Sequence, residues 1–186
     1  MIKTLQILII LFSGQILCYS QDVLSFEEEN ITFKIQDSVF IVQGLYYFNS
    51  KYEKQYSILY PFPSDSIYGK PFNVNVIYIN TGETISYKVN KDSSSIIFHT
   101  LISGKTPIMI SYHQQLKSNK AKYILISTNY WNKPLGQVDY KLITELDFKI
   151  KSFSIPPDKE ISLDNKKIYF WQKENFKPTI DFEIEY

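Results

Sequence analysis

The stretch Ile180-Asp181-Phe182-Glu183-Ile184-Glu185-Tyr186 alternates apolar and charged side chains without a break. Successive side chains of a β-strand point to opposite faces, so this period of two predicts a strand with one buried face and one solvated face. The same pattern occurs in 84–90 and in 148–151, and it resumes at 153–155. Half-exposed strands of this kind are typical of antiparallel sheets, because parallel sheets are usually covered on both faces.

Working outward from these runs, further strands are predicted wherever β-branched and aromatic residues cluster between turn residues. The predicted ranges are 31–36, 39–48, 55–60, 74–80, 95–101, 108–114, 122–127, 138–146 and 167–172. Asn80–Glu83 is predicted to close a hairpin with Gly82 at a positive φ, and 129–136 is predicted to be irregular with one helical turn. We therefore predict an all-β fold, an antiparallel β-sandwich of about ten to twelve strands.

The composition agrees with a single globular domain. The chain has 186 residues, with 15 Tyr, 13 Phe and one Ala, which is too apolar and aromatic for disorder and too poor in alanine for a helical protein. All of its basic residues are lysine, and the formal net charge is +1. Scattered lysines without arginine disfavour nucleic-acid binding.

Residues 1–20 have the pattern of a secretory signal peptide. Lys3 is followed by a mostly apolar stretch from Leu5 to Leu17, too short for a membrane anchor, and Cys18-Tyr19-Ser20 fits cleavage between Ser20 and Gln21. A buried N-terminal helix and lipidation of Cys18 are the alternatives. The expected product is an exported single domain, 21–186, without cysteine and without a transmembrane span, located in the periplasm, at the cell surface or in the medium.

Charge alone suggests one strand pairing. Lys149 and Lys151 occupy the polar face of one predicted strand, and Asp181, Glu183 and Glu185 occupy that of the last. Opposite charges facing each other on neighbouring strands contribute about 0.2–1 kcal/mol per pair. We therefore expect these two strands to be neighbours.

Two strand endings carry a family resemblance. Tyr46-Tyr47-Phe48-Asn49 ends one strand and Tyr60-Pro61-Phe62-Pro63 ends the next, which resembles the vault/inter-α-trypsin domain family and a related group of secreted bacterial β-sandwich domains of unknown function. The later segments 111–114 and 130–134 resemble landmarks of the bacterial group. Phe62 departs from the leucine usual in the vault-type turn. The resemblance implies a non-catalytic extracytoplasmic module with no catalytic residue to carry over.

The polar residues form no catalytic or metal-binding pattern. His99 and His113 lack metal-ligand spacing, so structural or surface positions are expected for both. Glu27-Glu28-Glu29 is interpreted as a solvated acidic run, and Asp158, Glu160 and Asp164 as a charged loop. No metal and no cofactor are predicted, and serine-hydrolase and phosphate-binding motifs are missing.

Aromatic residues are the best candidates for a binding site. Tyr130 and Trp131 lie in the predicted irregular segment, with Tyr123 shortly before it. Such side chains stack on sugar rings or anchor a partner protein, whereas the alternative is that Trp131 closes the end of the sandwich. Trp171 is expected to be buried in a strand. The predicted function is a non-enzymatic binding or assembly module for another envelope or extracellular protein; carbohydrate binding is the first alternative, and a hydrolase without a recognisable motif is the second.

Overall fold

The computed structural model describes residues 24–131 and 133–186, so the predicted signal peptide and its cleavage point at Ser20 and Gln21 lie outside the described residues. These residues form eleven strands and one short 3-10 helix, which confirms the all-β prediction. In chain order the elements are β1 Ser25–Gln36, β2 Val39–Pro61, β3 Pro71–Tyr78, β4 Tyr87–Val89, β5 Ser95–Gln115, β6 Lys120–Tyr123, η1 Ile126–Trp131, β7 Leu135–Glu145, β8 Ser152–Phe153, β9 Lys159–Leu163, β10 Lys166–Phe176 and β11 Phe182–Glu185.

The strands belong to two sheets. The larger has the order β3-β5-β2-β1-β7-β10-β9, with β4 added on β5, and the smaller has the order β6-β11-β8. The smaller sheet packs on the larger through aromatic rings, since Phe182 stacks on Phe33 at 4.7 Å and meets Trp171 edge-on at 4.9 Å. Trp171 is fully buried, as expected from the sequence, and its indole N–H donates to the Ile155 carbonyl at 2.9 Å.

One pairing departs from the antiparallel prediction. β1 and β7 run parallel, with Ile31 opposite Tyr140 and Phe33 opposite Leu142. Alternation of apolar and polar residues reports which face of a strand is buried and not the direction of its neighbour, so the sequence held no signal for this pair. The other ladders are antiparallel.

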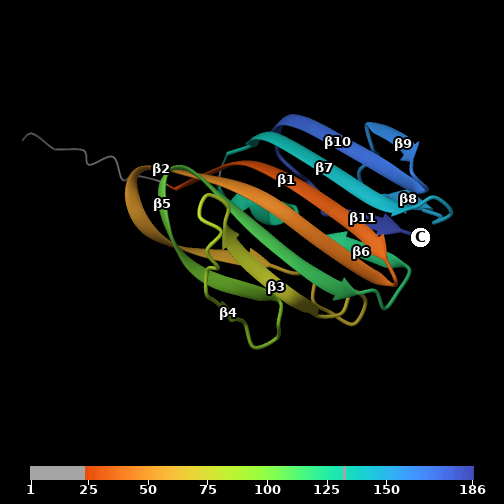
Figure 1. Ribbon diagram of the computed structural model, residues 1–186, viewed down its shortest axis with the longest axis horizontal. Coiled ribbons are helices and arrows are strands. Elements are labelled where there is room, and N and C mark those ends of the chain that lie inside the picture. Colours follow the sequence, from red (N-terminus) through yellow and green to blue (C-terminus); the bar gives the residue numbers. More distant parts are fainter. Residues whose placement is uncertain (1–23, 132) are drawn as a thin grey trace, which may run out of the picture.

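The two longest strands fold over onto themselves. The register of β2 against β5 breaks between Ser50 and Lys54, and Figure 1 shows both strands curving strongly at that end of the molecule. Tyr60 lies beyond the bend and contacts the other half of the hairpin, with ring centroids 5.5 Å from Tyr46 of β2 and 6.2 Å from Tyr112 of β5. A single hairpin therefore supplies part of both layers, and a β-bulge provides the bend.

Two local predictions are confirmed. Gly82 has a φ of 74°, and the hairpin around it is closed by the Tyr78 N–H, which donates to the Glu83 carbonyl at 2.9 Å. β8 and β11 are neighbours, and Lys151 lies 3.9 Å from Glu185, but the predicted strand at 148–151 is wrong, because Lys149 and Lys151 lie before β8 and outside any strand. Asp181 and Glu183, however, form their ion pairs with Lys122 and Lys120 of β6, on the other side of β11.

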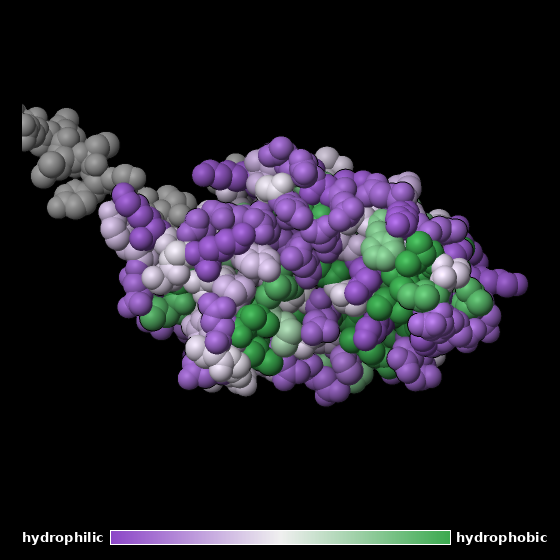
Figure 2. Space-filling view, turned by 45° about the horizontal axis from the view of Figure 1, so that its top comes forward, coloured by the Kyte–Doolittle hydropathy of each residue, from purple (hydrophilic) through white to green (hydrophobic). Residues whose placement is uncertain are grey.

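The surface is mostly polar on the face shown in Figure 2, where apolar residues gather in separate patches, one of them toward the end at which the C-terminus lies. Within residues 24–131 and 133–186, no helix combines the length and the apolar character needed to cross a bilayer.

Candidate functional site: an aromatic pocket between the layers

A pocket of about 1110 Å³ opens between the two layers. Its walls come from the start of β1, from β2 on both sides of the bend, and from the segment running from the end of β6 through η1. Seven of its nineteen lining residues are aromatic. A volume of this size suits a ligand or a segment of a partner rather than a single water molecule.

The pocket brings together the three residues that the sequence singles out. Tyr123 is buried on β6, Trp131 is half-buried at the end of η1, and Tyr130 is 89% exposed. Trp131 packs against Phe26 and Phe48, with ring centroids 5.8 and 5.7 Å away. Trp131 thus closes this end of the sandwich and lines the pocket at the same time, while Tyr130 projects into solvent.

The floor of the pocket contains a residue whose predicted environment is wrong. Glu29 is interpreted from the sequence as part of a solvated acidic run, yet its side chain is fully buried on β1 and lines the pocket. Its position follows the alternation of β1, because Glu29 shares the inward face with Ile31, Phe33 and Ile35. Extending that alternation back from Ile35 would have identified Glu29 as an inward-facing carboxyl group.

Burial controls the protonation of Glu29. Desolvation raises the pKa of Glu29 to about 7, and the Tyr140 hydroxyl bonded to it, together with the nearby Tyr123 hydroxyl, opposes this rise only in part. The Tyr140 hydroxyl donates to Oε1 of Glu29, whereas Oε2 is buried without a hydrogen-bond partner. Glu29 is therefore half protonated near neutral pH and leaves one oxygen unsatisfied at the pocket floor.

A cluster of tyrosines surrounds this carboxyl group. The Tyr46 hydroxyl lies 2.7 Å from that of Tyr60 and 3.0 Å from that of Tyr123. Burial, and the nearby Glu29 charge, hold the pKa of Tyr46, Tyr60, Tyr123 and Tyr140 well above the usual phenol value. These four hydroxyls stay protonated through the neutral range, so Glu29 is the group among them that titrates there.

One wall of the pocket is an open strand edge. β1 pairs with β2 only as far as Asn49, and after the bend Lys54–Pro61 pairs with β5 alone. The Phe62 N–H donates to the Ser94 carbonyl on the β5 side at 2.7 Å, so by alternation the backbone groups of Ser57 and Leu59 point away from β5. Both residues line the pocket, and within residues 24–131 and 133–186 no strand pairs with their outward peptide groups.

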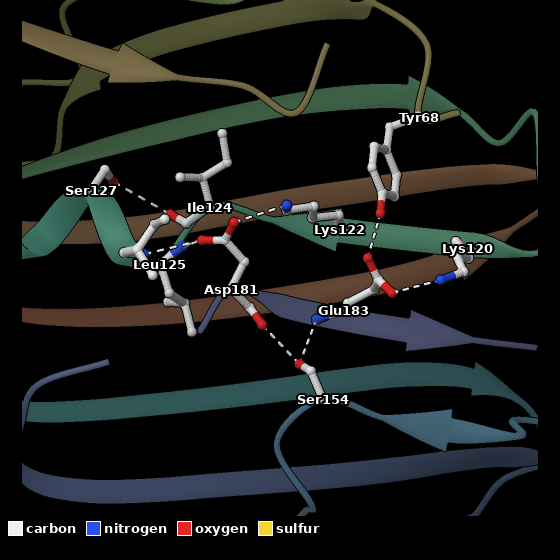
Figure 3. A network of polar contacts seen from close by, with 10 residues as sticks. Tyr68, Lys120, Lys122, Ile124, Leu125, Ser127, Ser154, Asp181 and Glu183 are labelled. Atoms are coloured by element: carbon white, nitrogen blue, oxygen red, sulfur yellow. Dashed lines mark hydrogen bonds and ion pairs between the residues drawn. The ribbon is translucent and has the colours of Figure 1, made fainter. Parts of the chain in front are cut away.

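The opposite wall is held in place by Asp181, which lies just before β11. Its Oδ1 accepts the backbone N–H groups of Leu125 and Ile126, at 3.0 and 3.1 Å, and its Oδ2 lies 2.9 Å from Lys122 (Figure 3). At the far end of the same wall, the Asn129 amide donates to the Pro178 carbonyl at 2.9 Å. The start of η1 is thus fixed by a carboxylate from the segment just before β11.

We expect Asp181→Ala to loosen this wall. The substitution leaves the N–H groups of Leu125 and Ile126 without their acceptor, and unfolding free energy should fall by about 1–2 kcal/mol. Hydrogen exchange of these two amides should accelerate more than that of β10 amides. Asp181→Asn keeps an acceptor oxygen and removes the ion pair with Lys122, so it should preserve most of the protection; equal loss in both variants would contradict the anchoring role of Oδ1.

The two histidines stay outside the pocket. His99 is exposed, with Nδ1 2.8 Å from the Ser57 hydroxyl, and His113 meets Phe72 edge-on at 5.5 Å. Asp158 forms an ion pair with Lys173, and Glu160 forms one with Lys167. The predicted charged loop is wrong for Glu160, which lies in strand β9 and pairs with Tyr169 of β10. Among the residues that the structure describes, no group of three or more His, Cys, Asp or Glu side chains is arranged to hold a metal ion.

Comparison with known proteins identifies the fold. No protein-family profile matches the sequence, and neither does any curated protein. A crystal structure of a "putative nutrient binding protein" from Legionella pneumophila is similar over 89% of this chain and 67% of its own, with 12% identity and a TM-score of 0.66. Two structures of an M1 zinc metallopeptidase from Deinococcus radiodurans match at a TM-score of 0.53, with 6% and 5% identity, over 87% of this chain. This chain spans only 42% of the peptidase, and identities this low show a shared fold alone.

Proposed function

We propose that this protein is an exported, non-enzymatic binding module that takes an extended segment of another envelope or extracellular protein into the pocket between its layers. The observation that carries this proposal is the open edge of β2, because Ser57 and Leu59 present peptide groups along a wall of an aromatic pocket. An added strand satisfies such an edge through main-chain hydrogen bonds, and neighbouring pockets hold its side chains. Binding by the similar Legionella protein is compatible with this role.

Site-specific cross-linking in the native host tests the proposal. A photoreactive p-benzoylphenylalanine in place of Tyr130 stands where the pocket meets solvent, and the same group in place of Leu163 on β9 serves as an exposed control. We expect a discrete adduct from position 130 whose cross-linked peptide belongs to one partner. Adding Ser127→Trp, which fills the pocket, should abolish the adduct, whereas Ser162→Trp should not; equal labelling from positions 130 and 163 would refute the proposal.

Leu59→Pro should separate folding from binding. Proline removes the Leu59 N–H, which points to the open edge and not to β5, so the ladder keeps its bonds and stability should fall by less than about 1 kcal/mol. The added strand loses one backbone donor, and the cross-link from position 130 should weaken about tenfold. Leu59→Ser changes the side chain and keeps the N–H; it should bind normally. Equal weakening by both substitutions would show that the backbone edge is not what the partner contacts.

Carbohydrate recognition is the second candidate function, and the exposure of Tyr130 beside Trp131 favours it. Soluble oligosaccharides that quench or shift Trp131 fluorescence, with loss of the effect in Trp131→Phe, would support it over a protein partner. Hydrolysis of the glycosidase type uses two carboxyl groups across a cleft. The nineteen lining residues include one carboxyl group, that of Glu29. The resemblance to the vault/inter-α-trypsin family stays part of the proposal, because both agree on a non-catalytic module.

A further inference from the structure

A carboxylate oxygen at the floor of the pocket has no hydrogen-bond partner. Glu29 is fully buried, its Oε1 accepts from Tyr140, and its Oε2 has no hydrogen-bond partner although the residue lines the pocket. Buried polar atoms in native proteins are normally paired, and leaving one unpaired is unfavourable by roughly 1–3 kcal/mol. A ligand that places a donor at this oxygen would remove that penalty.

The surroundings of Glu29 favour one sign of charge. No lysine, arginine or histidine is among the nineteen lining residues, and the seven aromatic rings include Phe26, Tyr46 and Trp131. The faces of aromatic rings attract cations. A carboxylate in a desolvated site likewise attracts cations, and it repels anions. The Glu29 carboxylate would repel an anionic ligand.

We propose that the pocket holds a primary ammonium group paired with the Glu29 carboxylate, supplied by a lysine side chain of the partner segment or by a free organic amine with an apolar body. This inference rests on the proposed function and names the chemistry that the pocket selects. The ammonium group donates to Oε2, and rings of the pocket wall cover the rest of its charge. The remaining volume accommodates the apolar stem, since an ammonium group fills only a small part of about 1110 Å³.

Binding of such a cation must be linked to the protonation of Glu29. The carboxyl group faces Tyr46 and Tyr60 of β2, Tyr123 of β6 and Tyr140 of β7, all of which stay neutral. Below pH 7 a proton competes with the ammonium group for the Glu29 carboxylate. The affinity for the ammonium group should therefore rise about tenfold per pH unit up to the neutral range and level off above it.

Three small molecules test the inference on the full chain. Phenethylammonium is the amine, 2-phenylethanol is its neutral analogue and 3-phenylpropionate is its anionic analogue. The readout is the amide NMR shifts of residues 123–131, followed between pH 5 and pH 8. A second arm replaces phenethylammonium by N-acetyl-lysine-N-methylamide, which separates a lysine side chain from a free amine.

We expect the amine to bind about fiftyfold more tightly at pH 7 than at pH 5, the alcohol to bind weakly with no such dependence, and the carboxylate not to bind. Glu29→Gln should remove the pH dependence for the amine. The pH series on the unsubstituted protein decides the matter even if that variant folds poorly. Amine binding that is flat with pH, equal binding of the alcohol, or no amine binding would overturn the inference, while the cross-link from position 130 independently reports on the proposed function.

Discussion

Between pH 4.5 and pH 8, the unfolding free energy of the unsubstituted protein should fall by about 3 kcal/mol more than that of Glu29→Gln. The pKa of Glu29 rises from 4.5 to about 7 on folding, because burial disfavours the carboxylate. The folded state then binds the proton more tightly than the unfolded state does. Its contribution is complete below pH 4.5 and is lost as the pH rises toward 7 and beyond.

The size of this effect follows from the shift itself. A rise of about 2.5 pH units corresponds to about 3 kcal/mol, and the full burial of Glu29 means that solvent screening does not reduce it. The carboxyl groups of Asp158 and Glu183 act in the opposite sense. Ion pairs and hydrogen bonds lower their pKa values, so the stability they provide is lost only as the pH falls into the acid range.

Urea unfolding at pH 4.5, 6, 7 and 8 measures the slope directly. Glu28→Gln is the matched control, since it removes the neighbouring carboxylate, which is partly exposed and pairs with Lys105, and it should leave the slope in place. A carboxyl ¹³C titration of Glu29 gives the pKa independently. A midpoint below 5, or equal slopes in the unsubstituted protein and Glu29→Gln, would contradict the buried acid.

Much of the fold follows from the sequence, because the period of two is a direct record of burial. Turn residues predicted the hairpin at Gly82, and opposite charges predicted that β8 and β11 are neighbours. The sequence predicts two separate strands at 39–48 and 55–60, but the chain continues as one strand through Ser50–Lys54. Ser50–Lys54 itself contains no glycine or proline; the glycine at the bend is Gly104 of β5, which lies opposite Ser50 and has a φ of 58°.

The aromatic part of the candidate site was predicted from the sequence, whereas its polar part, Glu29, was misinterpreted. Tyr130 and Trp131 stood out as aromatic residues in an irregular segment, and such residues commonly serve in recognition. Glu29 was obscured by its neighbours, because three consecutive glutamates suggest a solvated surface. A bulge between Phe26 and Glu28 shifts the register of β1. The inward position of Glu29 is therefore in phase only with the alternation of the residues that follow it.

Gly44→Ala should lower the unfolding free energy by about 2–3 kcal/mol and disrupt the pocket. Gly44 lies on β2 between Ile31 of β1 and Ile110 of β5, in the middle of the larger sheet. A Cβ atom there would lie 2.2 Å from the Tyr46 hydroxyl oxygen and 2.4 Å from its Cζ. The ring of Tyr46 therefore lies directly over the glycine, which is the one residue that leaves it room.

The ring cannot move aside without loss. Tyr46 is buried against Phe26 and Tyr60, with centroids 6.0 and 5.5 Å away, and its hydroxyl joins those of Tyr60 and Tyr123. Displacing it breaks that hydrogen-bonded cluster and strains a packed core, and overpacking of this kind typically destabilises by about 1–3 kcal/mol.

A double-mutant cycle separates this contact from a general intolerance at position 44. In Tyr46→Leu the shorter side chain no longer covers Gly44, so adding Gly44→Ala should lower stability by less than about 1 kcal/mol further. The same cycle should restore little of the cross-link from position 130, because the tyrosine cluster beneath the pocket is missing in both Tyr46→Leu proteins. Additive effects of the two substitutions on urea unfolding would mean that the glycine is needed for the backbone and not for the ring that it accommodates.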